Sequence, residues 1–163
     1  MDYSITELDI SSKELSVLPD DISRYKNLLK FNCSFNNITV LDNLPPTLQE
    51  LNCSNNNITS LDNLPMTLKE LDCSRNLITH LDNLPPELLT LVCWSNPLTK
   101  LDNLPITLKS LYCTSTKINI LDNLPKRLKV LQCNVDKLIH YPTNFKLIST
   151  NAFNIYKLEY ISP

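Results

Sequence analysis

The chain has 163 residues, which suffices for one domain with a substantial core. Its formal net charge of −2 excludes a strongly basic nucleic-acid-binding protein, and its 42% hydrophobic and 20% charged residues indicate a folded chain rather than a disordered one. No apolar run approaches the roughly 18 residues of a membrane-spanning helix, and the N-terminal residues show no secretory signal, so we expect no membrane partner.

The first predicted unit covers residues 5–27, with the sequence ITELDISSKELSVLPDDISRYKN. It fits the frame of the units that follow it but is three residues longer. Its return segment, LPDDISRYKN, therefore has room for a single helical turn.

From residue 28 to residue 127 the chain repeats with a fixed period of 20 residues, as in the unit LQELNCSNNNITSLDNLPMT of residues 48–67. Within LQELNCS we predict a short strand, because its side chains alternate: Leu51 and Cys53 point inward, whereas Glu50, Asn52 and Ser54 point to solvent. One unit cannot bury its leucines alone, so neighbouring units must stack.

The second half of each unit carries the sequence LDNLP, which starts at Leu41, Leu61, Leu81, Leu101 and Leu121. We predict an extended segment here, because proline fixes its own φ and disfavours a helical conformation of the preceding residue. Leu41, Leu44 and their counterparts are expected to point inward, while Pro45 and its counterparts stiffen the turn. Because glycine is absent, turns with positive φ must use asparagine or aspartate.

A seventh, decaying unit begins at residue 128, and the units share the form L-x-x-L-x-[CI]-x-x-[NTDK]-x-[IL]. This pattern resembles the leucine-rich repeat family, and the 20-residue units are most similar to the short repeats of bacterial type-III effectors, which also carry an LPxLP segment. The resemblance implies a right-handed solenoid with a short parallel sheet on its concave face and extended, polyproline-like segments on its convex face. Such a fold is nominally α/β but contains mostly strand and coil, with little helix.

We expect one leucine-rich repeat domain over residues 1–163. About seven repeats occupy residues 5–142, and residues 143–163 form a degenerate C-terminal cap. Apolar residues of this cap, such as Phe153, Leu158 and Ile161, would cover the last unit.

Six cysteines occupy one inward position of the repeat, namely Cys33, Cys53, Cys73, Cys93, Cys113 and Cys133. A metal site would need clustered ligands such as Cys-x-x-Cys, which the sequence lacks. Neighbouring strands lie roughly 4.8 Å apart, farther than the roughly 3.5–4.5 Å between the Cβ atoms of a disulfide. We interpret the cysteines as small apolar core residues, which suit a reducing intracellular compartment: the cytoplasm, or the host cytoplasm for a viral or bacterial effector.

A second inward position carries Asn36, Asn56, Asn76 and Asn96, continued by Thr116 and Asp136. An inward-facing amide can bond to the backbone of neighbouring turns, whose polar groups would otherwise be buried without a partner. The resemblance implies the same role. We predict that this lane is structural.

The aspartates of the LDNLP segments form a third column, which consists of Asp42, Asp62, Asp82, Asp102 and Asp122. We expect each carboxylate to accept a hydrogen bond from the backbone N–H two residues on, as in an Asx turn. The alternative is a cation such as Ca²⁺ bound along the column, since carboxylate oxygens suit it. We predict no cofactor.

The outward positions of the strands are free of the stacking requirement, and there the units differ. Toward the N-terminus they are acidic at Glu50, Glu70 and Asp72, with Lys30 among them; toward the C-terminus they become apolar, aromatic or small at Val92, Trp94, Tyr112 and Thr114. Trp94 is the only tryptophan and interrupts a lane that otherwise reads Ser34, Ser54, Ser74, Thr114 and Asn134. We predict a partner-binding surface at these outward positions, with Trp94 as its anchor. The alternative is that Trp94 packs on Tyr112 and Val92 without a partner.

The motifs of catalysis are absent from the sequence: it has no nucleophile elbow, no HExxH and no phosphate-binding loop. The effectors that are enzymes carry a separate ubiquitin-ligase domain with a Cys-x-Asp motif, and no cysteine here precedes an aspartate at that spacing. We therefore predict a non-catalytic protein–protein interaction module.

Two other functions stay open. One is a structural scaffold that associates end to end through an uncapped sheet edge. The other is nucleic-acid or lipid binding through the basic residues Lys109, Lys126, Arg127, Lys129 and Lys137.

Overall fold

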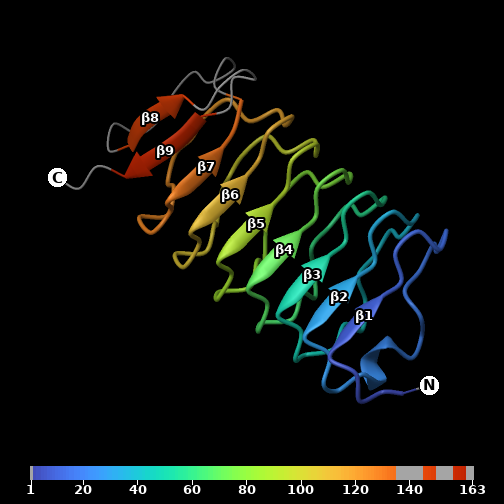
Figure 1. Ribbon diagram of the computed structural model, residues 1–163. Coiled ribbons are helices and arrows are strands. Elements are labelled where there is room, and N and C mark those ends of the chain that lie inside the picture. The colour runs from blue at the N-terminus through green and yellow to red at the C-terminus, as the bar shows by residue number, and fades with distance from the viewer. Residues whose placement is uncertain (1, 135–144, 150–155, 161–163) are drawn as a thin grey trace.

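The computed structural model describes residues 2–134, 145–149 and 156–160, and it places seven short strands side by side in one parallel sheet (Figure 1). The strands follow the order of the chain and are β1 (Glu7–Asp9), β2 (Lys30–Asn32), β3 (Glu50–Asn52), β4 (Glu70–Asp72), β5 (Thr90–Val92), β6 (Ser110–Tyr112) and β7 (Val130–Gln132). A single turn of 3-10 helix, η1 (Ile22–Arg24), lies in the longer first return, as its length predicts. The predicted solenoid is confirmed.

Equivalent residues of successive units lie next to each other across the sheet, because every pair of neighbouring strands is in register. Leu51, for example, pairs with Phe31 on one side and with Leu71 on the other. The inward leucines and isoleucines of each unit form one continuous core, in which Leu51, Ile58 and Leu68 are at most 2% exposed. Burying such a side chain contributes roughly 1.5–3 kcal/mol, and each unit gains it only from its neighbours.

The LDNLP segments close the solenoid on the side opposite the sheet. Their first leucine is buried in every unit, with at most 3% exposure, whereas their second ranges from buried at Leu64 to half-buried at Leu44. Each proline then opens a tight turn, as where the carbonyl of Pro45 accepts a hydrogen bond of 3.2 Å from the N–H of Leu48. These segments are extended, as predicted from the prolines.

Two positions in each repeat have positive φ. The asparagines of the LDNLP segments occupy the first, with φ between 56° and 64°, and are Asn43, Asn63, Asn83, Asn103 and Asn123. The second follows the strand, with φ between 52° and 55°, and carries Phe35, Asn55, Arg75, Ser95 and Ser115. The prediction that asparagine or aspartate fills such turns is therefore correct for the first position but wrong for most of the second.

Beyond β7 the chain forms a second, antiparallel pair of strands, β8 (Phe145–Ser149) and β9 (Tyr156–Tyr160). Strand β9 lies beside β7 at the C-terminal end of the sheet (Figure 1). Leu158 belongs to β9, while Phe153 and Ile161 lie outside the described residues, as do Asp136 and Lys137. The role of this region as a cap stays a prediction.

Within the described residues, none of the helical segments has the length and apolar character needed to cross a membrane.

Candidate functional site

Two outward lanes run across the face of the sheet, one from the first residue of each strand and one from the third. Strand register orders the first lane as Glu7, Lys30, Glu50, Glu70, Thr90, Ser110 and Val130. It orders the second lane as Asp9, Asn32, Asn52, Asp72, Val92, Tyr112 and Gln132. All of these side chains are exposed or half-buried, so this face of the sheet is open to a partner.

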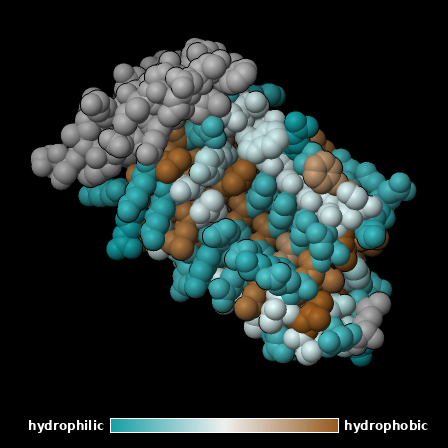
Figure 2. Space-filling model, viewed as in Figure 1, coloured by the Kyte–Doolittle hydropathy of each residue, from teal (hydrophilic) through white to brown (hydrophobic). Residues whose placement is uncertain are grey.

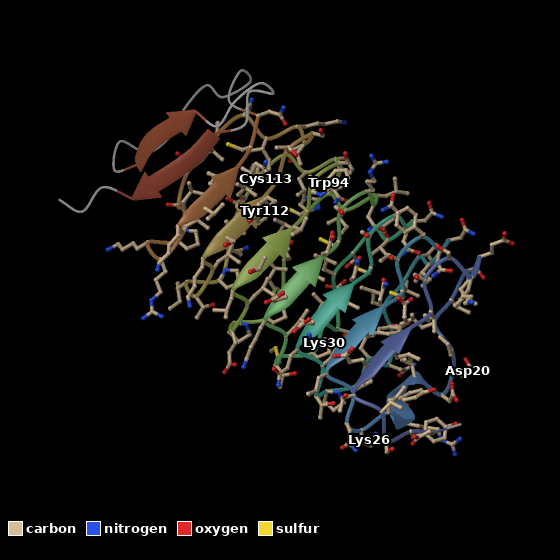
Figure 3. The ribbon with its side chains drawn as sticks, viewed as in Figure 1. Asp20, Lys26, Lys30, Trp94, Tyr112 and Cys113 are labelled. Carbon is tan, nitrogen blue, oxygen red and sulfur yellow. The ribbon has the colours of Figure 1, made fainter. Side chains whose placement is uncertain are left out.

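The N-terminal part of this face forms a trough of about 460 Å³ that runs across β1 to β5. Five carboxylates line it, those of Glu7, Asp9, Glu50, Glu70 and Asp72. One ammonium group, that of Lys30, lies among them (Figure 3). The trough is therefore strongly acidic, although the whole chain has a net charge of only −2.

Lys30 forms an ion pair with Glu50, with 3.1 Å between Nζ and Oε2. The hydrogen bond to Glu50 is the main reason that the pKa of Lys30 is raised, and the charges of Glu7 and Glu70 add to it. Asp9 is held ionised by hydrogen bonds from the side chain and backbone of Ser11 and from Asn32, which lower its pKa. Lys30 and Asp9 thus keep their charges at neutral pH.

The C-terminal part of the face is less polar. Strand register puts Val92 directly beside Tyr112, and Trp94 and Thr114 follow two residues later, just past the ends of β5 and β6. Figure 2 shows pale and brown side chains over β5 and β6, whereas teal side chains are more prominent toward the N-terminal strands. The structure thus brings together four of the predicted binding residues, and places Glu50, Glu70 and Asp72 in the adjoining trough.

Trp94 has a contact that sequence reasoning missed. The guanidinium carbon of Arg75 lies 4.8 Å from the centroid of the indole ring, which is a cation–π contact between neighbouring repeats. Arg75 adopts positive φ, so its side chain leaves the strand in a direction that simple alternation does not predict. Trp94 and Tyr112 share no ring–ring contact within the described residues, although both lie over the same part of the sheet (Figure 3).

The lane of small residues that Trp94 interrupts is not an outward lane, which corrects the expectation for Ser54. Ser34, Ser54 and Ser74 are buried, with at most 5% exposure. The strand has already ended at Asn52, and both the N–H and the hydroxyl of Ser54 donate to Asn52 Oδ1. The alternation of inward and outward side chains therefore ends before the serine position. At the equivalent position of the repeat after Ser74, the larger side chain of Trp94 extends outward and is half-buried.

The cysteine lane lies in the core. All six cysteines are free thiols with at most 3% exposure. Burial raises the pKa of every one of them, to about 12 for Cys33 and about 11 for Cys133. Thiols that stay protonated are poor nucleophiles and poor metal ligands.

The asparagine lane joins successive repeats through their backbones. The Asn76 amide donates to the carbonyls of Cys53 and Cys73, both at 3.0 Å, and its oxygen accepts from the N–H of Ile58 at 2.9 Å. Asn56 and Asn96 make equivalent bonds. Thr116 donates only to the carbonyl of Cys113 among the bonds of the described residues. These side chains are bound to the protein itself and are not available to a ligand.

The aspartate column is exposed, and two of its members, Asp62 and Asp82, are held differently from the prediction. Asp62 accepts from the side-chain amide of Asn83 at 3.1 Å, and Asp82 accepts from that of Asn103 at 3.2 Å. The asparagine reaches back to the preceding repeat because its positive φ turns it there, so these bonds run between repeats instead of closing an Asx turn within one. The described residues contain no group of three or more histidine, cysteine or acidic residues placed to hold a metal ion, and Asp42, Asp102 and Asp122 do not form one.

The described basic residues proposed for nucleic-acid or lipid binding lie off the sheet face. Lys109 and Lys129 immediately precede β6 and β7, and Lys126 and Arg127 lie in the turn before the latter. All four are exposed.

Three solved structures that are similar to the chain come from bacteria. The functional domain of InlJ from Listeria monocytogenes, which includes a cysteine ladder, is 33% identical, with a TM-score of 0.66 over 86% of this chain and 35% of that one. The leucine-rich repeat domain of a Shigella effector is 32% identical, with a TM-score of 0.68 over 74% of this chain and 54% of that one. YopM from Yersinia enterocolitica WA-314 is 32% identical, with a TM-score of 0.55 over 65% of this chain and 28% of that one.

No protein-family model matches the sequence, and neither does any curated protein. The repeat, the parallel sheet and the similar structures together define a solenoid of short repeats. The chain belongs to the leucine-rich repeat proteins, and its repeats resemble those of bacterial effectors. It spans between 28% and 54% of the length of the three proteins above.

Proposed function

We propose that the chain is a non-catalytic protein-interaction module that binds a partner protein on the open face of its parallel sheet. The observation that carries the proposal is the group formed by Val92 on β5, Tyr112 on β6 and Trp94 just past β5. Their half-buried side chains depart from the polar pattern of the other repeats. Solenoids of this kind present extended concave surfaces to their partners, and apolar patches rimmed by polar residues mark interaction sites.

A cytoplasmic location, in a host cell for an effector, is part of the proposal. Six buried free thiols in one lane are compatible with a reducing compartment. The similarity to a Shigella effector and to YopM supports the comparison with effectors.

Trp94→Ala tests the anchor role. We expect the variant to lose at least about 2 kcal/mol of binding free energy toward the partner, the usual threshold of an interface hot spot. Its stability should fall by only about 0.5–1 kcal/mol, because the half-buried ring gives up chiefly its contact with Arg75. Capture of partners from host lysate, followed by titration of the captured protein, measures the first quantity, and urea unfolding measures the second.

Phe35→Ala is the matched control, because it removes an exposed aromatic ring that lies outside the two sheet lanes. It should leave binding unchanged. Equal affinity of wild type and Trp94→Ala would contradict the proposal, and so would an unfolded Trp94→Ala variant, since the ring would then serve packing.

End-to-end self-association is the second candidate, since β1 has a strand on one side only within the described part of the sheet. A concentration series by light scattering separates the two functions: a particle that grows with concentration favours the scaffold, whereas a monomer favours the interaction module.

A further inference from the structure

We propose that the sheet face over β1 to β5 binds an extended segment of a partner protein that carries two basic residues on the same side of an apolar one. This inference rests on the proposed function and specifies the chemistry of the partner. It is carried by the shape of the face, by the separation of charge along it and by the spacing of its side chains.

The shape is that of an open trough whose floor is the sheet itself. Central strand residues such as Leu51 and Leu71 lie beneath it, and the two outward lanes rise from it. The space of about 460 Å³ over this floor suits a single extended chain. Within the described residues no segment of the protein covers this face (Figure 1).

The charge in the trough is not neutralised from within. Lys30 pairs with Glu50, but Glu7 and Glu70 on either side of that pair form no ion pair among the described residues. In the second lane, Asp9 lies on β1 with Glu7, and Asp72 lies on β4 with Glu70. The hydrogen bonds that these two aspartates accept come from uncharged donors of Ser11, Asn32 and Ser74. The carboxylates of β1 (Glu7 and Asp9) and those of β4 (Glu70 and Asp72) therefore form no ion pair among the described residues, and a lysine or arginine complements each of these two pairs.

The less polar end fixes where the apolar residue of the partner lies. One strand beyond Asp72 the lane continues with Val92, and then with Tyr112. The guanidinium of Arg75 already lies on the ring of Trp94, so a further basic side chain would meet a positive charge there. This end consequently favours an apolar residue, and the acidic end favours basic ones.

The spacing sets the pattern of the segment. Neighbouring strands lie roughly 4.8 Å apart, so the acidic pairs on β1 and β4 are roughly 14 Å apart. An extended chain advances roughly 3.3 Å per residue, and its side chains alternate between two faces. Two side chains that are four residues apart in sequence therefore lie on the same face, at a distance of roughly 13 Å. Val92 lies one strand further on, within reach of the next side chain on that face. The expected pattern is basic-x-x-x-basic-x-apolar or its reverse, apolar-x-basic-x-x-x-basic, because the spacing is the same for both chain directions.

Selection of a random library of linear 12-residue peptides on the immobilised full chain tests the proposal. We expect the enriched peptides to carry two lysine or arginine residues and an apolar residue in this pattern. Labelled copies of single enriched peptides should bind the protein, as measured by fluorescence anisotropy. The double variant Glu70→Gln, Asp72→Asn should weaken that binding about tenfold or more, because it removes the charges on β4 while keeping the hydrogen-bond acceptor for Ser74.

Glu87→Gln is the matched control. It removes one acidic charge from an exposed turn outside the trough and should leave the affinity unchanged. An equal loss in Glu87→Gln would show attraction to overall charge and overturn the proposal. The proposal would also be overturned if the wild type self-associated and Glu70→Gln abolished this self-association, because the trough would then bind a second copy of the chain.

The remaining outcomes separate this inference from the proposed function. Enriched peptides without basic residues that lose binding in Trp94→Ala would overturn the basic segment and support the interaction module. Enriched peptides that are insensitive to every substitution on the sheet face would overturn both.

Discussion

Phe35 has a φ of 55° at a position where the next repeat places Asn55. Positive φ crowds the Cβ of most residues against the backbone, whereas asparagine tolerates it. The Phe35 ring is 60% exposed, so the core gains little from it. We therefore expect Phe35→Asn to raise the free energy of unfolding by about 0.5–1 kcal/mol, measured by urea denaturation.

Phe35→Ala separates backbone strain from loss of the ring. Alanine has a Cβ and lacks the amide of asparagine, so this variant should be no more stable than wild type. If Phe35→Asn and Phe35→Ala were stabilised equally, the exposed ring of Phe35, and not its backbone conformation, would be what lowers the stability of the wild type.

The turn that follows each strand depends on its asparagine. Asn76→Ala would leave the buried N–H of Ile58 without its partner. The carbonyls of Cys53 and Cys73 would each lose one of two bonds, because they also accept from the amides of Asn56 and Asn96. A buried polar group that loses its partner costs about 1–3 kcal/mol, so we expect the free energy of unfolding, measured with urea, to fall by about 1–3 kcal/mol.

Asn57→Ala provides the comparison, because this exposed neighbour of the lane should change stability by less than about 0.5 kcal/mol. Asn76→Thr should lie between the two, since Thr116 keeps one such hydrogen bond at the equivalent position. A stable Asn76→Ala variant would show that water or relaxed backbone replaces the amide.

The repeat predicts the strands, the buried leucines and the extended LDNLP segments because these follow from period and from proline. It does not predict the ends of the strands. Alternation assigns Ser54 to solvent, but the hydrogen bonds of Asn52 and the positive φ of Asn55 turn the chain first. The contact of Arg75 with Trp94 was missed for the same reason, since backbone conformation at these turns is not encoded by residue type alone. The binding roles of Val92, Tyr112 and Thr114 stay predictions.

At the scale of the whole molecule, the six cysteine thiols lie in one buried lane, so their ionisation affects the stability of the fold together. Burial raises their pKa values in the folded state, to about 11 for Cys133 and about 12 for Cys33, whereas a thiol of the unfolded chain ionises near pH 8.5. Above that pH the unfolded state binds fewer protons than the folded state, so the free energy of unfolding falls as pH rises. Below about pH 8.5 the thiols are protonated in both states, so their contribution to the free energy of unfolding is fully present.

Each thiol lowers stability by about 1.4 kcal/mol per pH unit above its unfolded pKa, and six together remove about 8 kcal/mol by pH 9.5. That is comparable with the whole stability of a typical domain. We therefore expect the reduced protein to unfold between about pH 9 and pH 10, followed by circular dichroism with a reductant present. In Cys73→Ala, the number of protons released on unfolding at alkaline pH should fall by about one, so its stability should depend less steeply on pH. The variant should be less stable than wild type at pH 7, because the removed thiol leaves a cavity. A pH dependence that stays the same in this variant would show that other groups, such as tyrosines or lysines, control alkaline unfolding.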